Sequence, residues 1–84
     1  MEDAELRALE AKWRERLENA RIRYEEAKAT VRAIRELQSE IRSLDMSFAL
    51  EYALRAEDEF LTEFKRVLTI FNDLVNYEKI PEED

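Results

Sequence analysis

The side chains that could carry chemistry in this sequence are carboxylates, and two groups of them are consecutive, at Glu25–Glu26 and at Glu57–Asp58–Glu59. Oxygen ligands of this kind suit Mg²⁺ or Ca²⁺. Consecutive side chains on a helix point in different directions, however, so such runs chelate an ion poorly. A carboxylate-based enzyme that uses a divalent metal is therefore only a remote alternative.

Several residue types on which enzymes and metal sites commonly depend do not occur in the 84-residue sequence. The sequence has no histidine, no cysteine and no glycine, and it has one proline. It therefore lacks the commonest general base, any thiolate ligand or nucleophile, and any glycine-rich phosphate loop. We expect a protein that is not an enzyme and has no catalytic residue, no metal site and no cofactor.

A column of basic residues is the most regular polar pattern. Its members recur every seven residues, each one position after an apolar residue: Arg7, Arg14, Arg21, Lys28, Arg35 and Arg42. We interpret this basic column as the border of a helix contact, with its cations paired to acids of a neighbouring helix. The candidate acids are Glu51, Asp58, Glu59 and Glu63. A track for a polyanion is the alternative, but no aromatic residues interleave with the column, so we expect no nucleic acid partner.

Glu57 interrupts an apolar series in the second half of the chain, between Leu50 and Phe64. A carboxylate at a helix contact is costly unless it is paired, and Arg35 or Arg32 could reach it. We expect an edge position with a salt bridge. A role in fixing the register or the oligomeric state is the alternative.

Two long helices must position these residues. Apolar residues recur every seven positions at Leu6, Trp13, Ala20, Ala27, Ile34 and Ile41, which predicts a helix over about 4–43. Asp45 and the serines around it favour a break, so we expect a turn at 43–47. A second helix is predicted over about 47–78, and an acidic tail at 81–84 begins with Pro81. One continuous helix of about 120 Å is the alternative, because no glycine or proline marks the turn.

The second predicted helix is apolar over an unusually wide face. Three seven-residue series lie side by side: a central one of Leu54, Leu61, Leu68 and Val75, one with Leu50, Phe64 and Phe71, and one with Ala53, Phe60, Val67 and Leu74. Together they span roughly 160°, against about 100° on an ordinary surface helix. One partner helix cannot cover such a face.

Side-chain sizes favour a hairpin over a rod. If the chain reverses near Asp45, an antiparallel pairing places Ala27 opposite Phe64 and Ala20 opposite Phe71, and small residues that face large ones permit close packing. The expected fold is all-α: an antiparallel hairpin of two long helices that forms one domain over residues 1–84. We expect it to dimerise into a four-helix bundle or coiled coil.

The interface is expected in the second half of the second helix, which is apolar on nearly all sides. Ile70 and Tyr77 lie off the main apolar face and would anchor a partner. The full predicted set is Phe60, Phe64, Val67, Ile70, Phe71, Leu74 and Tyr77.

The net charge of −7 comes entirely from residues 45–84, which hold four basic and eleven acidic residues. Nucleic acid and anionic membranes would repel this half. No stretch approaches the about 18 apolar residues of a membrane span, and residues 1–5 resemble no targeting signal. We expect a cytoplasmic protein without membrane contact.

These observations predict a small non-enzymatic helical protein that acts by protein–protein association, as a self-associating or scaffold protein and most simply as a homodimer. One alternative is a regulatory module that binds a basic or helical partner protein through the second helix. Another is a designed helical bundle without a biological function. The missing glycine favours a designed bundle, whereas the irregular surface opposes it.

Overall fold

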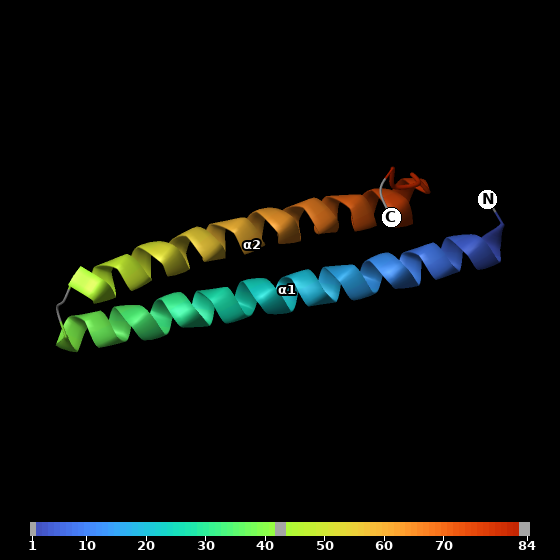
Figure 1. Ribbon diagram of the computed structural model, residues 1–84. Helices are drawn as coiled ribbons and strands as arrows, with labels where there is room; N and C mark the ends of the chain where they lie inside the picture. Colours follow the sequence, from blue (N-terminus) through green and yellow to red (C-terminus); the bar gives the residue numbers. More distant parts are fainter. Residues whose placement is uncertain (1, 42–43, 83–84) are drawn as a thin grey trace.

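The protein is a hairpin of two antiparallel helices. The computed structural model describes residues 2–41 and 44–82, and within them it contains two α-helices and no strand, α1 (Asp3–Glu40) and α2 (Leu44–Tyr77). The helices pack against each other along most of their length (Figure 1). The predicted all-helical hairpin is confirmed. The longest dimension is 58 Å, about half the length that one continuous helix would need.

The connection between the helices is shorter than the sequence suggests. Ile41 is extended, with φ −125° and ψ 111°, so α1 ends at Glu40. The predicted turn at 43–47 is wrong for residues 44–47, because they belong to α2. Asp45, which suggested the break, lies in the first turn of α2, where the helix dipole favours an acidic side chain. The predicted first residue of this turn, Ser43, lies outside the described residues, as does Arg42 before it.

α2 ends four residues before the proline. Glu78 adopts a left-handed conformation with φ 53°, which is a common way for a helix to end. The N–H of Lys79 then donates to the carbonyl of Asp73 at 3.2 Å. A helix that continued through Pro81 would bring the proline ring against the carbonyl of Tyr77, so the chain turns away first.

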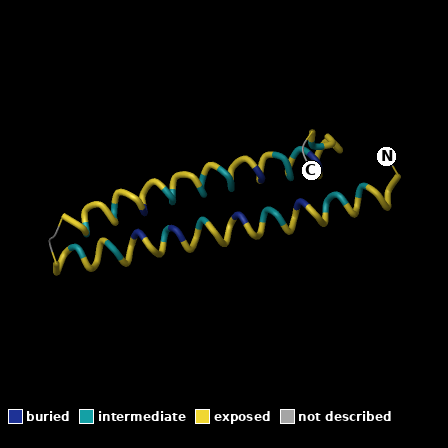
Figure 2. Tube along the Cα trace, in the orientation of Figure 1, coloured by how far each residue is buried: buried dark blue, intermediate teal, exposed yellow. Residues whose placement is uncertain are grey.

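The core is a thin strip between the helices (Figure 2). Its buried members are Trp13, Ala20, Ala27 and Val31 of α1, and Ala53, Val67 and Leu74 of α2. Three of the four residues on α1 belong to the predicted seven-residue series. Trp13 and Leu74 are the largest side chains that are fully buried. The largest buried side chains of the core therefore lie near the end of the hairpin opposite the turn.

The helices pair about one helical turn away from the expected register. The ring of Tyr24, rather than Ala27, meets Phe64, with the ring centroids 6.1 Å apart and the planes 23° from parallel. Ala27 instead lines a hollow together with Phe60. The register differs because α2 begins at Leu44, so the chain reverses earlier than expected. Small residues of α1 still face large ones of α2.

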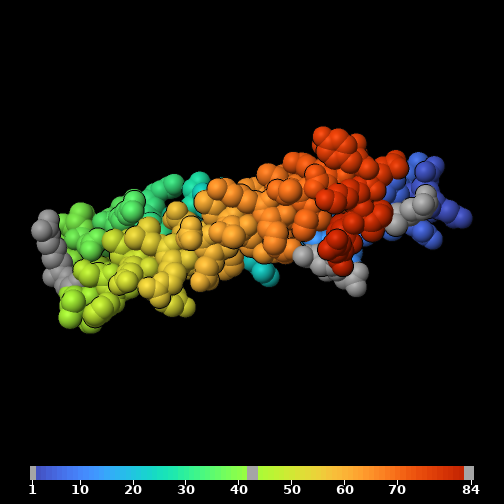
Figure 3. Space-filling model, turned by 90° about the horizontal axis from the view of Figure 1, so that it is seen from above, coloured from blue at the N-terminus to red at the C-terminus, as the bar shows by residue number. Residues whose placement is uncertain are grey.

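The N-terminal end of α1 extends beyond the end of α2, as the view from above shows (Figure 3). Leu6 and Leu9 in this end are half-buried and pack against the core around Trp13 and Leu74. The projecting end of α1 is thus tied to the hairpin by its apolar side chains.

Candidate functional site

α2 carries a row of apolar side chains that the hairpin leaves partly exposed. We call it the leucine ridge, and it consists of Leu54, Leu61, Leu68 and Val75. Leu54 is 37%, Leu68 36% and Val75 44% exposed. The sequence predicted this series at the centre of the apolar face. In the hairpin, however, the buried series is the neighbouring one that begins at Ala53, whose members each come one residue before a member of the leucine ridge. A single neighbouring helix covers only part of a wide apolar face, so one series remains outside.

The seven predicted interface residues differ in how much surface they offer. Val67 and Leu74 are buried in the hairpin core. Phe60, Phe64, Ile70 and Phe71 are half-buried, and Tyr77 is exposed. Another chain could therefore reach Tyr77 and the edges of the half-buried side chains, but it could not reach the two core residues without opening the hairpin. The leucine ridge, absent from the predicted set, offers a more continuous apolar surface.

Two ring contacts place the basic column and the leucine ridge on the same face of the hairpin. The guanidinium of Arg14 lies over the ring of Phe71, 5.6 Å from its centroid, and the ammonium of Lys28 lies 5.2 Å from the centroid of Tyr24. Phe64 and Phe71 each follow a residue of the leucine ridge by three positions, so they lie beside it on the helix surface. We call this surface the ridge face: the leucine ridge borders it on α2, the basic column borders it on α1, and Tyr24, Phe64 and Phe71 lie between them.

The salt bridges of the basic column stay within α1. Arg21 Nε donates to Glu18 Oε2 at 3.1 Å, and Lys28 Nζ lies 3.7 Å from Glu25 Oε2. Within the described part of the chain, Arg7, Arg14 and Arg35 have no carboxylate within 4 Å. Arg42 lies outside the described residues. The column thus presents several cations to solvent along one edge of the ridge face.

Among the described residues, the acids predicted to pair with this column form no salt bridge with it. Glu51 instead pairs with Arg55 at 3.4 Å, and Glu63 pairs with Arg66, both within α2. The one-turn shift in register and the position of the column at the outer edge of α1 account for this difference. In the part of the chain that the structure describes, no salt bridge joins the column to an acid of α2.

Three pKa shifts accompany the strongest of these local pairs. The hydrogen bonds from Arg21 hold the pKa of Glu18 below its ordinary value and raise the pKa of Arg21 itself. In the same way, the hydrogen bonds from Arg66 lower the pKa of Glu63. The shifts show that these hydrogen bonds stabilise the charged forms of two residues that lie three positions apart on one helix. They mark helix surface pairs rather than a group prepared for proton transfer.

Glu57 lies at the turn-side end of the ridge face. It is half-buried and lines a hollow together with Lys28, Arg32 and Arg35. The predicted cations are thus its neighbours, yet within the described residues Glu57 has no ion pair shorter than 4 Å. A carboxylate among three cations faces a favourable field without being fixed by any one of them.

The opposite face carries the hollow that contains Ala27 and Phe60, which is mainly apolar and which the sequence did not reveal. Four alanines line it, Ala27 from α1 and Ala49, Ala53 and Ala56 from α2, with a volume of about 480 Å³. Tyr52, one of the most exposed apolar side chains, stands at its rim. The signal was present as alanines three and four positions apart in α2, but alanine suits both a helix surface and a helix contact.

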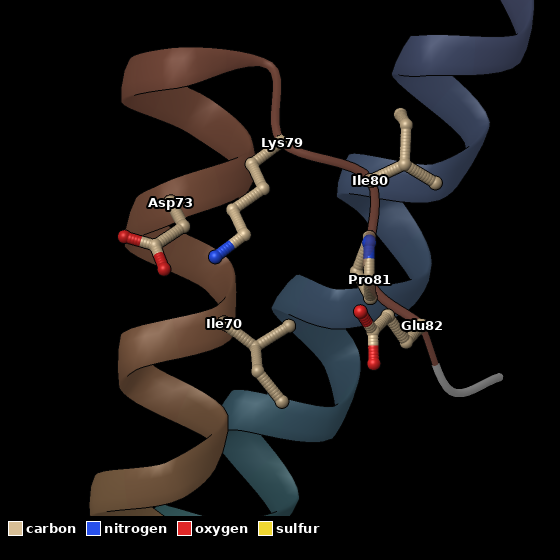
Figure 4. Close-up of a pocket in the computed structure, with 6 residues that line it drawn as sticks. All are labelled: Ile70, Asp73, Lys79, Ile80, Pro81 and Glu82. Atoms are coloured by element: carbon tan, nitrogen blue, oxygen red, sulfur yellow. The ribbon is translucent and has the colours of Figure 1, made fainter.

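The chain after α2 crosses over to α1. Figure 4 shows residues 79–82 leaving α2 and running to the first part of α1, with Ile70 and Asp73 facing the hollow beneath them. Trp13 is fully buried and its Nε1 has no hydrogen-bond partner among the described residues. The guanidinium of Arg16 lies 4.6 Å above its ring. A segment without helical structure thus runs across to α1 near the end of the hairpin that contains Trp13.

Two features, a metal-binding group and a membrane span, are not found among the described residues. In residues 2–41 and 44–82, no three acidic side chains gather into a group that could hold a metal ion. Neither helix in that part of the chain is long and apolar enough to span a membrane. Comparisons with protein families, with curated proteins and with solved structures find no match to this chain.

Proposed function

We propose that this protein acts by protein–protein association, without catalysis, and that the ridge face binds a second copy of the hairpin. The single observation that carries this proposal is the leucine ridge, whose members are spaced seven residues apart and remain partly exposed. A repeat of this kind is typical of a helix that has another helix against it. The product would be a four-helix bundle.

The surface area of the hairpin supports an additional partner. The chain exposes 6503 Å², whereas a compact monomer of its 10.1 kDa mass would expose about 5,300 Å². A standard interface buries about 800 Å² on each partner. One such contact on the ridge face would bury about two thirds of the area by which the hairpin exceeds a compact monomer.

The charges on the ridge face favour a helical partner over a flat apolar one. Long basic side chains pack their methylene stems on apolar surface while their charged ends reach outward. In the hairpin, Arg14 places its guanidinium over the ring of Phe71, 5.6 Å from its centroid. A second hairpin would bring acids of its own α2 towards these cations. A lipid-like or purely apolar surface has no such acids to offer.

Substitution of Leu68 by glutamate tests the proposal. A charge buried at an apolar contact is strongly unfavourable, so Leu68→Glu should weaken self-association by at least about a hundredfold. The matched control is Thr69→Glu, which adds the same charge at the neighbouring position, where the side chain points away from the ridge face. Light scattering should show that Leu68→Glu dissociates at a concentration where the native chain and Thr69→Glu remain associated. Equal masses for both variants would contradict the proposal.

The alanine-lined hollow favours a second candidate function. It is apolar, lies on the face opposite the leucine ridge, and has the exposed ring of Tyr52 at its rim. Aromatic side chains at such positions commonly anchor partners. A regulatory module that binds a helical partner protein through α2 would use this surface. That function predicts binding that Tyr52→Ala weakens and Leu68→Glu leaves intact.

A further inference from the structure

We infer that the second copy docks on the ridge face with both turns at the same end of the bundle, so that each leucine ridge lies against the basic column of the other chain. This inference rests on the proposed self-association and specifies its geometry. It assigns a role to Arg35, which has no carboxylate within 4 Å among the described residues of the hairpin. It also assigns a role to the acids that flank the leucine ridge.

Two symmetric arrangements could cover the ridge face. A twofold axis parallel to the helices places α2 of each copy against α1 of the other, with both turns at one end. A twofold axis across the helices instead places α1 on α1 and α2 on α2, with the turns at opposite ends. Both arrangements bury the leucine ridge, so apolar contact alone does not choose between them.

Charge chooses the first arrangement. Stacking α1 on α1 would bring two basic columns together, and like charges at a helix contact are unfavourable. In the first arrangement, each basic column instead meets the outer edge of a leucine ridge. Three positions before each member of the ridge, that edge carries Glu51, Asp58, Lys65 and Asn72. Its two acids lie at the turn end and its one cation lies nearer the other end.

The contacts within one hairpin show which residues lie at the same height. Ile34 and Ala53 line one hollow, and Ala27 and Phe60 line the same hollow further along. Arg35 therefore lies level with the region of Glu51. A twofold axis parallel to the helices keeps these heights, so Arg35 would meet Glu51 of the second copy.

The same levels place two further members of the column, Lys28 and Arg21. Lys28 would meet Asp58 of the second copy, and its own salt bridge to Glu25 is long, at 3.7 Å. Lys65 would lie level with Arg21 of the second copy. Glu18 already neutralises Arg21 within the same helix. The one cation on the outer edge of the ridge thus faces Arg21, which forms a short ion pair in its own helix. Arg35, which has no carboxylate within 4 Å in the described residues, meets an acid.

Distances between spin labels test the orientation directly. The chain has no cysteine, so Glu40→Cys and Ala8→Cys each give a single labelling site, and both residues are exposed away from the ridge face. With both turns at one end, the two labels in a dimer are separated only by the width of the bundle, about 20–35 Å at either site. With the turns at opposite ends, the labels at residue 40 would lie about 50 Å apart.

The outcomes separate the orientation from the association itself. Short distances at both sites support the inference. A long distance at residue 40 in a sample of dimeric mass overturns the orientation and leaves self-association standing. A sample of monomeric mass without dipolar coupling overturns both.

A charge exchange provides a second test. Arg35→Glu and Glu51→Arg should each weaken the dimer about tenfold, because two symmetric pairs per dimer each contribute up to about 1 kcal/mol and are replaced by repulsion. Arg35→Glu combined with Glu51→Arg should restore the dissociation constant to within about threefold of the native value. Lys12→Glu, a charge reversal away from the ridge face, is the control and should change the constant less than about twofold. A double variant as weak as the two single effects combined would contradict the pairing.

Discussion

Replacement of Leu74 by alanine probes the contact that holds the hairpin together. Leu74 is 0% exposed and packs in the cluster that contains Trp13, Ala20 and Val67. Burial of a leucine side chain contributes about 1.5–3 kcal/mol, and the cavity left by its removal raises the loss to about 2–5 kcal/mol. In a chain of this size, 1 kcal/mol corresponds to about 4–8 °C in Tm. A loss of about 3 kcal/mol therefore predicts a Tm lower by about 12–24 °C.

The matched control is Ile22→Ala, which removes the same number of carbon atoms from α1. Ile22 is 41% exposed, and alanine has the higher helix propensity, so its Tm should change by no more than a few degrees. Thermal unfolding followed by circular dichroism at one fixed concentration compares the two variants. If Leu74→Ala lowers the Tm no more than Ile22→Ala does, then Leu74 does not lie between the helices and the observed register is refuted.

Three further predictions concern the ends and the polar residues of the hairpin. Removal of residues 78–84 should uncover Trp13 and shift its fluorescence emission to longer wavelength; an unchanged spectrum would mean that the crossing segment does not shield it. The depressed pKa of Glu18 means that its ion pair with Arg21 stabilises α1 fully above its ordinary pKa of 4.5 and is lost as the pH falls below that range. Helicity measured by circular dichroism should therefore fall on acidification, less steeply in Glu18→Gln, and identical profiles would argue against the pair. Glu57→Leu should tighten self-association and admit larger oligomers, as measured by sedimentation, because it extends the apolar surface and removes a charge that restricts register; a weaker dimer would show that Glu57 makes favourable contacts across the interface.

The seven-residue spacing made the helices and their antiparallel pairing predictable. Trp13, Ala20 and Ala27 are buried as their series predicted, because a helix repeats its facing side about every two turns. The turn was less predictable, because Asp45 favours both a break and the first turn of a helix. The misplaced turn then moved the pairing by about one helical turn.

The exposed surface was harder to predict than the fold. Three adjacent apolar series on α2 could each face α1, and their composition does not rank them. The buried series contains Ala53, Val67 and Leu74, while the leucine-rich series beside it stays outside. The choice depends on how the whole length packs, including the fit of Trp13 against Leu74. Such a three-dimensional fit is not visible in a periodic pattern.

The basic column was recognised from its spacing, but its partners were not. Arg21 and Lys28 pair with acids three positions earlier on their own helix. Local pairs of this kind compete with pairs between helices because they require no particular register. Among the described members of the column, Arg35 lies nearest the turn and has no such pair. The proposed dimer supplies it with a partner.

The mass of the native chain over a concentration series is the most direct test of association through the ridge face. Sedimentation equilibrium from about 1 to 200 μM should show the mass rise from that of the single 10.1 kDa chain to twice that value and then remain constant. Leu68→Glu should remain at the lower mass throughout this range. A native chain that stays at 10.1 kDa at the highest concentration would contradict self-association and leave the leucine ridge without its proposed partner.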